Sequence, residues 1–242
     1  MKLEIIAFNI ESCIAAQSAG ADRIELCANP AEGGTTPSLA FIREARRVLE
    51  IELYVMIRHR GGNFIYTKEE MEIMKDDIAA CKNLGCDGIV MGMLLEDGKI
   101  DSENCKCLVD YAYPLGVTFH RAFDRAADPL LALEEIIECG CERILTSGQK
   151  QKATEGALLI KTLISNAQDR IAIMPGSGVN SSNIIDLANV TGAKEFHSSA
   201  SLITQKQIAY KNELAQTDDG YVTVNAEEVK KMKHNLTEFS SR

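Results

Sequence analysis

Eight short apolar segments alternate with amphipathic segments along almost the whole chain, and this alternation constrains the fold more than any other feature. The apolar segments are bounded by Gly, Pro or Asp and are rich in β-branched residues, as buried parallel strands are. We expect strands at residues 3–8, 23–27, 52–58, 88–92, 116–120, 143–146, 170–175 and 195–197. The clearest helical patterns between them cover residues 38–49, 68–84, 129–138 and 156–166.

Alternating strands and helices predict βαβ units and a parallel sheet. Eight strands are the number that closes a (β/α)8 TIM barrel, and such barrels typically have about 250 residues. An open doubly wound sheet is the alternative. No linker, low-complexity segment or charge block divides the 242 residues. We therefore expect a single TIM-barrel domain over residues 1–242, with a loop-like segment at 201–225 and a closing helix at 226–236.

The overall charge excludes some classes of partner. The chain carries 26 Lys and Arg against 35 Asp and Glu, a formal net charge of −9, without a basic run. Such a chain is a poor ligand for nucleic acid or an anionic membrane. Its apolar runs are too short for a signal peptide or a membrane span, so we expect a cytoplasmic protein. Most of its eight cysteines would then be free, small buried hydrophobes rather than a disulfide scaffold.

Polar residues gather toward the carboxyl ends of the expected strands, where parallel α/β proteins bind their ligands. Side chains alternate along a strand between the barrel interior and the helices. This alternation predicts an inward-facing polar set and an apolar set, including Leu145, that faces the helices. The inward-facing set is Glu4, Glu25, Arg58, Thr118, His120, Thr146, Glu195 and His197. A structural ion network of Glu4, Glu25 and Arg58 is the other interpretation of these charges.

The segment that follows the fifth expected strand carries acid–base chemistry. His120 and Arg121 come directly after the strand, and Asp124 lies three residues further on. This arrangement predicts His120 as a general acid or base with a cation and a carboxylate nearby, and Glu25 would orient or share its proton. A histidine that is only a satisfied core residue is the alternative.

Two sets of residues are candidate anion ligands. Arg58 and Arg60 precede Gly61-Gly62, which resembles an anion clamp, although a solvated basic turn is the alternative. The loops after the last two strands stand where such barrels bind phosphate, although a Gly-x-Gly is by itself only a turn. The predicted ligand-binding residues of these loops and of the neighbouring strand end are Thr146, Ser147, Gly176, Gly178, His197, Ser198 and Ser199.

Cys27 differs from the other cysteines because it ends the second strand with the same parity as Glu25. Its thiol is therefore expected to point into the barrel mouth, where it could act as a soft-metal ligand or a nucleophile. The alternative is again a small buried hydrophobe.

Several of these motifs, taken together and in this order, resemble the CutC family over essentially the whole chain. They are ADRIELC at 21–27, EGGTTPS at 32–38, TFHRAFD at 118–124, LTSG at 145–148 and EFHSSA at 195–200. The resemblance implies a TIM barrel, a cytoplasmic homodimer or higher homo-oligomer, no organic cofactor, and a role in copper homeostasis through Cu(I) binding by cysteines.

The sequence departs from the family pattern at two positions. Ile6 stands where relatives proposed to bind Cu(I) have a cysteine, and His59 stands where the family has proline. Cys27 alone leaves Cu(I) short of soft ligands unless Met56 or His197 completes the site.

Two functions remain open at this point. One is a metal-handling protein that binds Cu(I) at the barrel mouth and needs Cys27. The other is a lyase, isomerase or hydrolase that acts on a small anionic, for example phosphorylated, molecule. In that enzyme His120 would move a proton while Arg58 and Arg60 hold the anion.

Overall fold

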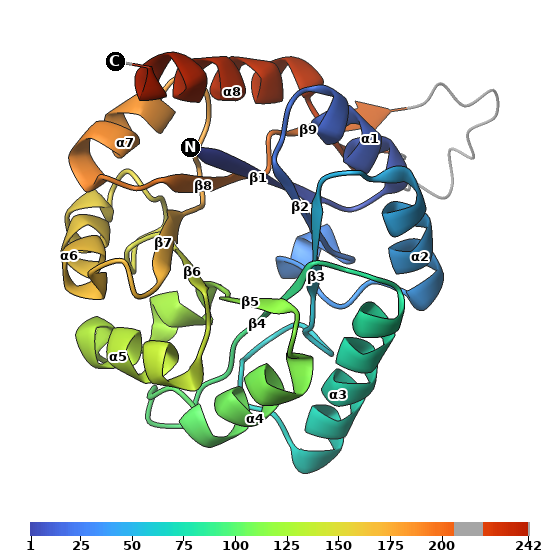
Figure 1. Ribbon diagram of the computed structural model, residues 1–242, viewed down its shortest axis with the longest axis vertical. Helices are drawn as coiled ribbons and strands as arrows, with labels where there is room; N and C mark the ends of the chain where they lie inside the picture. The colour runs from blue at the N-terminus through green and yellow to red at the C-terminus, as the bar shows by residue number, and fades with distance from the viewer. Residues whose placement is uncertain (206–219, 242) are drawn as a thin grey trace, which may run out of the picture.

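A computed structural model describes residues 1–205 and 220–241. Eight parallel strands form the wall of a barrel, and helices surround it (Figure 1). The hydrogen-bonded order of the strands is β7-β6-β5-β4-β3-β2-β1-β8, and β7 also contacts β8, which completes the ring. The predicted TIM barrel is therefore confirmed, and the open doubly wound sheet is not what the chain forms.

The strands of the barrel are short, and each connection between successive strands carries a helix. The strands are β1 (Lys2–Ala7), β2 (Arg23–Leu26), β3 (Glu52–Met56), β4 (Gly88–Met91), β5 (Gly116–Phe119), β6 (Arg143–Thr146), β7 (Ala172–Pro175) and β8 (Glu195–Ser198). The helices are α1 (Ile10–Ser18), α2 (Leu39–Val48), α3 (Lys68–Asn83), α4 (Ser102–Ala112), α5 (Pro129–Cys139), α6 (Ala157–Ala167), α7 (Ile184–Thr191) and α8 (Ala226–Ser240). Two 3-10 turns, η1 (Pro30–Glu32) and η2 (Arg121–Arg125), follow β2 and β5.

Local sequence explains where individual helices begin and end. Helix α5 begins after Asp128, whose carboxylate accepts hydrogen bonds from the backbone N–H groups of Leu130 and Leu131. Pro129 occupies the first helical position, where its missing N–H has no cost. The helix ends at Gly140, whose φ of 89° is the left-handed conformation that favours glycine.

An ionic network fills the amino-terminal end of the barrel. Arg23 is fully buried, and its guanidinium bonds Glu4 Oε2 and Glu195 Oε2, each at 2.5 Å. Arg143 bonds Glu195 Oε2 at 2.6 Å and Thr118 Oγ1 at 2.9 Å. The ion-network interpretation therefore holds for Glu4, although its partners are not the expected ones. Buried charges of both signs compensate one another here, as a low-dielectric interior requires.

The expectation of a loop over residues 201–225 is wrong at both ends of that segment. β9 (Ser201–Gln205) and β10 (Gly220–Val224) pair as an antiparallel hairpin, and residues 206–219 between them lie outside the described part of the chain. The backbone of β10 is bonded to α1 and its cap, because Asn9 donates to Val222 O and the Val224 N–H donates to Ser12 Oγ. Polar residues hide the strand pattern in the sequence, since β9 lies mostly exposed.

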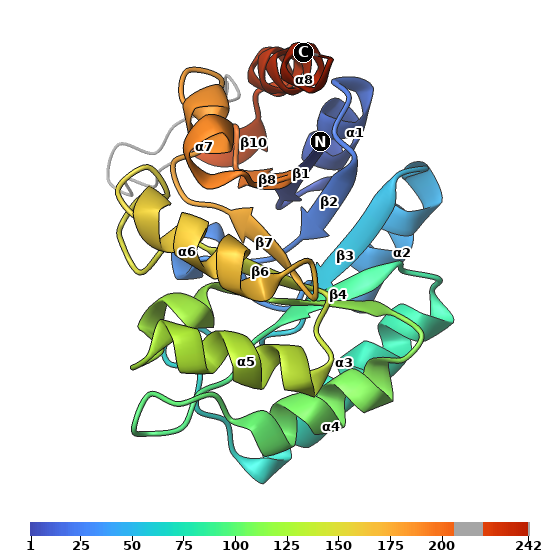
Figure 2. The same ribbon diagram turned by 60° about the vertical axis from the view of Figure 1, so that its left-hand side comes forward.

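Helix α8 follows the hairpin and lies between α7 and α1 on the outer ring (Figures 1 and 2). It extends from Ala226 to Ser240, four residues beyond the expected end. Val229, Met232 and Leu236 form its buried face, and this 3-4 spacing is that of an amphipathic helix.

Candidate functional site

A cavity of about 400 Å³ opens at the carboxyl ends of the strands. It is bordered by residues from most of the barrel and by Ser201 and Val222 of the β9–β10 hairpin. The expected site residues that line it are Glu25, Arg58, His120, Arg121, Gly178, His197 and Ser199. The expected site residues that do not line it are Cys27, Arg60, Asp124, Thr146, Ser147, Gly176 and Ser198.

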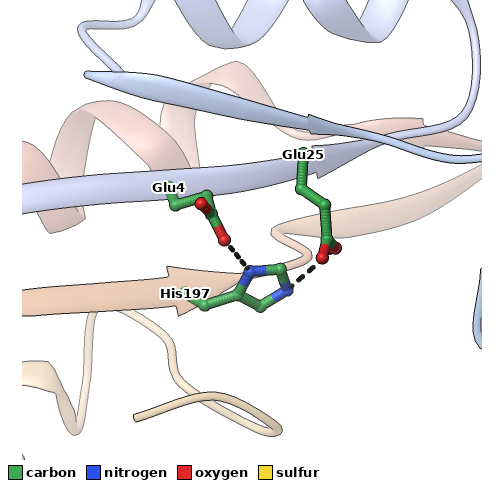
Figure 3. A group of neighbouring side chains, drawn as sticks. All are labelled: Glu4, Glu25 and His197. Atoms are coloured by element: carbon green, nitrogen blue, oxygen red, sulfur yellow. Dashed lines mark hydrogen bonds and ion pairs between the residues drawn. The ribbon is translucent and has the colours of Figure 1, made fainter. Parts of the chain in front are cut away.

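Glu4, Glu25 and His197 form a buried row beneath this mouth cavity (Figure 3). The register of β1 against β8 places Glu4 beside His197, and Glu25 lies on the neighbouring strand β2. His197 Nδ1 lies 2.7 Å from Glu4 Oε1, and Nε2 lies 3.8 Å from Glu25 Oε2. The imidazole therefore connects a carboxylate of the ionic network to a carboxyl group of the cavity.

The three groups have different proton affinities. Burial opposes ionisation of Glu4, but the His197 hydrogen bond and Arg23 together lower its pKa to about 2. Burial raises the pKa of Glu25 to about 7, and the negative Glu4 adds to this effect. Burial disfavours a charged His197, but Glu25 and Glu4 raise its pKa above the ordinary value. Glu25 and His197 thus hold protons near neutral pH, as an acid–base pair must.

His120 has a different role from the one expected. Its Nδ1 accepts a hydrogen bond from the Ala122 N–H, which leaves the proton of the neutral ring on Nε2. Burial, together with the positive charge of Arg58, lowers the pKa of His120 to about 3. At neutral pH the ring is uncharged and its Nε2–H is a donor without a partner in the described residues. His120 therefore suits a fixed hydrogen-bond donor better than a general base.

The expected two-arginine clamp is not formed. Arg58 is 6% exposed and donates to the carbonyl oxygens of Glu32, Gly34 and Gly62, so it holds two loops together. Arg60 lies outside the mouth cavity and pairs with the Glu70 carboxylate at 2.5 Å. A neighbouring pair of arginines in the sequence thus separates into one cavity residue and one loop residue.

Asp124 organises the loop after β6 instead of facing the mouth cavity. Its carboxylate accepts from Thr146 Oγ1 at 2.5 Å, from the Ser147 and Gln149 N–H groups at 3.1 Å, and from Arg121 Nε at 2.8 Å. Arg121 also donates to Ser147 Oγ, and of these residues only Arg121 lines the mouth cavity. Asp124, Thr146 and Ser147 therefore position this loop.

The inward-facing side of β6 differs by one residue from the expected one. Arg143 and Leu145 face the interior, and Leu145 lines the mouth cavity, whereas Thr146 points to Asp124. Polarity alone led to the wrong parity, because an apolar residue faces the cavity at this strand end. Arg23 and Arg143 were missed by the same reasoning. The parity of Glu25 would have identified Arg23, which lies two residues earlier on β2.

The loops after β7 and β8 only partly match a phosphate site. Ser177, Gly178 and Ser199 border the mouth cavity. Ser177 Oγ donates to Gln151 O, and Ser198 Oγ donates to Val179 O. Ala200 and strand β9 follow β8 directly, so the barrel has no helix N-terminus at this point to attract an anion.

Cys27 lies in a small apolar cluster with Tyr54, Met56 and Val90. The thiol is fully buried, and burial together with the carboxylates of Glu25 and Glu4 raises its pKa well above the ordinary value. A protonated thiol of this kind fits the buried-hydrophobe interpretation. All eight cysteines are free, and only Cys107 is exposed.

The Glu4–Glu25–His197 group has donor atoms close enough together for a metal ion. One ligand atom from each residue lies within 4.8 Å of the others. Carboxylate oxygens and imidazole suit hard or borderline divalent ions rather than Cu(I), which prefers sulfur. Glu4 is already bonded to Arg23 and to His197 Nδ1. The contacts present are therefore those of a hydrogen-bond relay.

The fold and this cavity define a TIM-barrel protein with a buried acid–base pair at the carboxyl ends of its strands. The CutC family model matches residues 1–202. A family protein CutC of Parabacteroides distasonis is 49% identical over 87% of this chain and 87% of its own length. The human copper homeostasis protein cutC homolog is 46% identical over 87% of this chain and 77% of its own.

A solved structure of CutC from Streptococcus agalactiae is 36% identical, with a TM-score of 0.79, and the match covers 82% of this chain and 98% of that one. The chain belongs to the CutC family, as its motifs predicted. Within the described residues, no helix is both long and apolar enough to cross a membrane.

Proposed function

We propose that this protein is an enzyme that transfers a proton on a small anionic molecule bound in the mouth cavity. One observation carries the proposal. Of the four buried side-chain polar atoms that lack a partner in the described residues, three belong to residues of this cavity: Glu25 Oε1, Arg58 Nε and His120 Nε2. Buried polar groups without a partner are rare and costly, so their convergence indicates a ligand that supplies the missing partners.

The geometry divides the work among three groups. Glu25 borders the cavity and would take or give the proton, since its pKa is raised to about 7. His197 would pass the proton on and hold the position of Glu25 through its contact with Glu4. The Nε2–H of neutral His120 would stabilise a developing negative charge on a substrate oxygen. An isomerase or lyase needs this combination of base and donor.

Solvent deuterium provides a test in which the substrate itself need not be identified beforehand. We expect the wild-type protein, incubated in D2O with a small-molecule metabolite extract, to raise the mass of at least one compound by one unit or to deplete it. Glu25→Gln should lower this rate about 10²–10⁴-fold, the usual contribution of a general acid or base. Mass spectrometry of the extract measures both effects.

The matched control is Glu134→Gln, at a surface carboxylate on α5 that pairs with Arg170. It should retain the wild-type rate. Unchanged masses and amounts with the wild-type protein, or equal rates in Glu25→Gln, would contradict the proposed proton transfer.

Copper as cargo is the second candidate, because relatives carry copper homeostasis names and because Cys27 and Met56 share one cluster. Ile6 supplies no second thiol, and the Cys27 thiol is buried and protonated. We therefore expect an anaerobic Cu(I) titration against a chromophoric chelator to show weak binding that is alike in wild type, Cys27→Ser and Cys13→Ser. Tight one-to-one binding that is lost only in Cys27→Ser would establish the copper function instead.

From the family resemblance we also propose a cytoplasmic homo-oligomer. Sedimentation velocity of the purified protein measures the number of subunits directly.

A further inference from the structure

A second cleft, of about 620 Å³, adjoins the mouth cavity. The two spaces share Gly33, Arg58, Phe64 and Arg121 as lining residues, so one ligand could extend from one into the other. The cleft is lined by residues of η2 and of the loop after β6, whereas Glu25 and His197 line only the mouth cavity. None of the expected catalytic groups except Arg121 and Asp124 borders the cleft.

Two guanidinium groups lie against a single ring in this cleft. The Cζ atoms of Arg58 and Arg125 lie 4.9 and 5.2 Å from the centroid of Phe64. Within the described residues, neither arginine has a carboxylate at ion-pair distance. Arg58 is almost completely buried, and its Nε has no hydrogen-bond acceptor there. Two like charges around one ring repel each other unless an anion lies between them.

The remaining charged residues of the cleft do not supply that anion. Arg121 and Asp124 pair with each other at 2.8 Å. Lys150 adds a further cation, and no carboxylate of the described residues pairs with it. Glu155 is exposed on the cleft lining. The carboxylate of Glu32 lies against Gly61, where a Cβ atom would overlap it.

We infer that this cleft binds the phosphate group of a small phosphate monoester whose reacting part lies in the mouth cavity. The inference rests on the proposed function and names its substrate class. Arg58, Arg125 and Lys150 carry three positive charges without a paired carboxylate in the described residues, and a phosphate dianion neutralises these better than a single carboxylate. Guanidinium groups also match the oxygens of phosphate in geometry.

This location differs from the usual phosphate site of such barrels, at the loops after β7 and β8. The hydroxyls of Ser177 and Ser198 in those loops are already bonded to backbone carbonyls. The hairpin strand β9 occupies the chain position where a helix N-terminus would otherwise follow β8.

The test is a titration of the full-length protein with inorganic phosphate, followed by ¹H–¹⁵N chemical shifts. We expect Arg125→Gln to weaken phosphate binding about tenfold or more, the scale of a lost charge-assisted hydrogen bond. Arg125 is exposed, so the thermal midpoint should not change. Lys152→Gln is the matched control, because Lys152 lies beside Gly178 on the β7 loop. It should leave phosphate affinity unchanged.

Each other result overturns the inference in a different way. A loss in Lys152→Gln but not in Arg125→Gln would place the phosphate on the β7 loop. Equal affinity for acetate and phosphate would exclude the phosphate assignment, and no saturable binding would exclude the site. Glu25→Gln should keep its phosphate affinity. A phosphate site that survives when the deuterium test fails would therefore separate this inference from the proposed chemistry.

Discussion

Replacing Glu25 with glutamine is expected to stabilise the folded protein at pH 8. Burial raises the pKa of this carboxyl from an ordinary 4.5 to about 7. The folded state therefore holds the proton more tightly than the unfolded state does. The contribution of Glu25 to the free energy of unfolding is fully present below pH 4.5 and is lost as the pH rises through about 7. A shift of this size corresponds to about 3 kcal/mol at pH 8.

His197 acts in the same direction, because its raised pKa also contributes stability that disappears as the pH rises through the folded-state pKa. Glutamine cannot ionise, and it removes the carboxylate that raises the pKa of His197. The difference in unfolding free energy between variant and wild type should therefore grow between about pH 5 and pH 8. Urea unfolding at the two pH values measures it.

Glu134→Gln is the control here too, because its carboxylate is at the surface and pairs only with Arg170 among the described residues. Its stability difference from wild type should be about 0–1 kcal/mol at both pH values. A Glu25→Gln protein less stable than wild type at pH 8 would show that the carboxylate is structural. A stabilised variant would mark Glu25 as a residue whose retention serves activity at the expense of stability.

The Arg23→Met substitution should destabilise the protein by about 3–5 kcal/mol, the cost of removing one partner from a buried ion pair. Arg23 is fully buried between Glu4 and Glu195 and also reaches Glu52 at 3.1 Å. Its loss would leave Glu4 as a buried carboxylate with His197 as its remaining close partner. Urea unfolding at pH 7 measures the effect.

The matched control for this substitution is Arg170→Met, at a surface pair with Glu134, which should cost about 0–1 kcal/mol. The double variant Arg23→Met/Glu4→Gln should recover part of the loss, because the stranded charge is then removed. A cost of less than about 1 kcal/mol for Arg23→Met would mean that the network contributes little to stability.

Much of the fold follows from local patterns. Apolar segments alternating with amphipathic helices predict eight strands, and the structure has eight strands in the barrel. The period of two along a strand brings Glu4, Glu25 and His197 to one interior, as the structure shows. Where that period was replaced by polarity, as at Thr146, the prediction was wrong. The hairpin after β8 was missed because its exposed strand has no apolar alternation.

Periodicity, helix caps and motifs are properties of neighbouring residues, so they were enough to predict the barrel, its family and most of the polar residues at its mouth. The chemistry of those residues depends instead on partners that are distant in the chain. His197 and Glu4 are separated by 193 residues and yet share a hydrogen bond. Proton affinities and ion pairs follow from such contacts and from burial, which arise only when the chain folds. The same causes made His120 a neutral donor and separated Arg58 from Arg60.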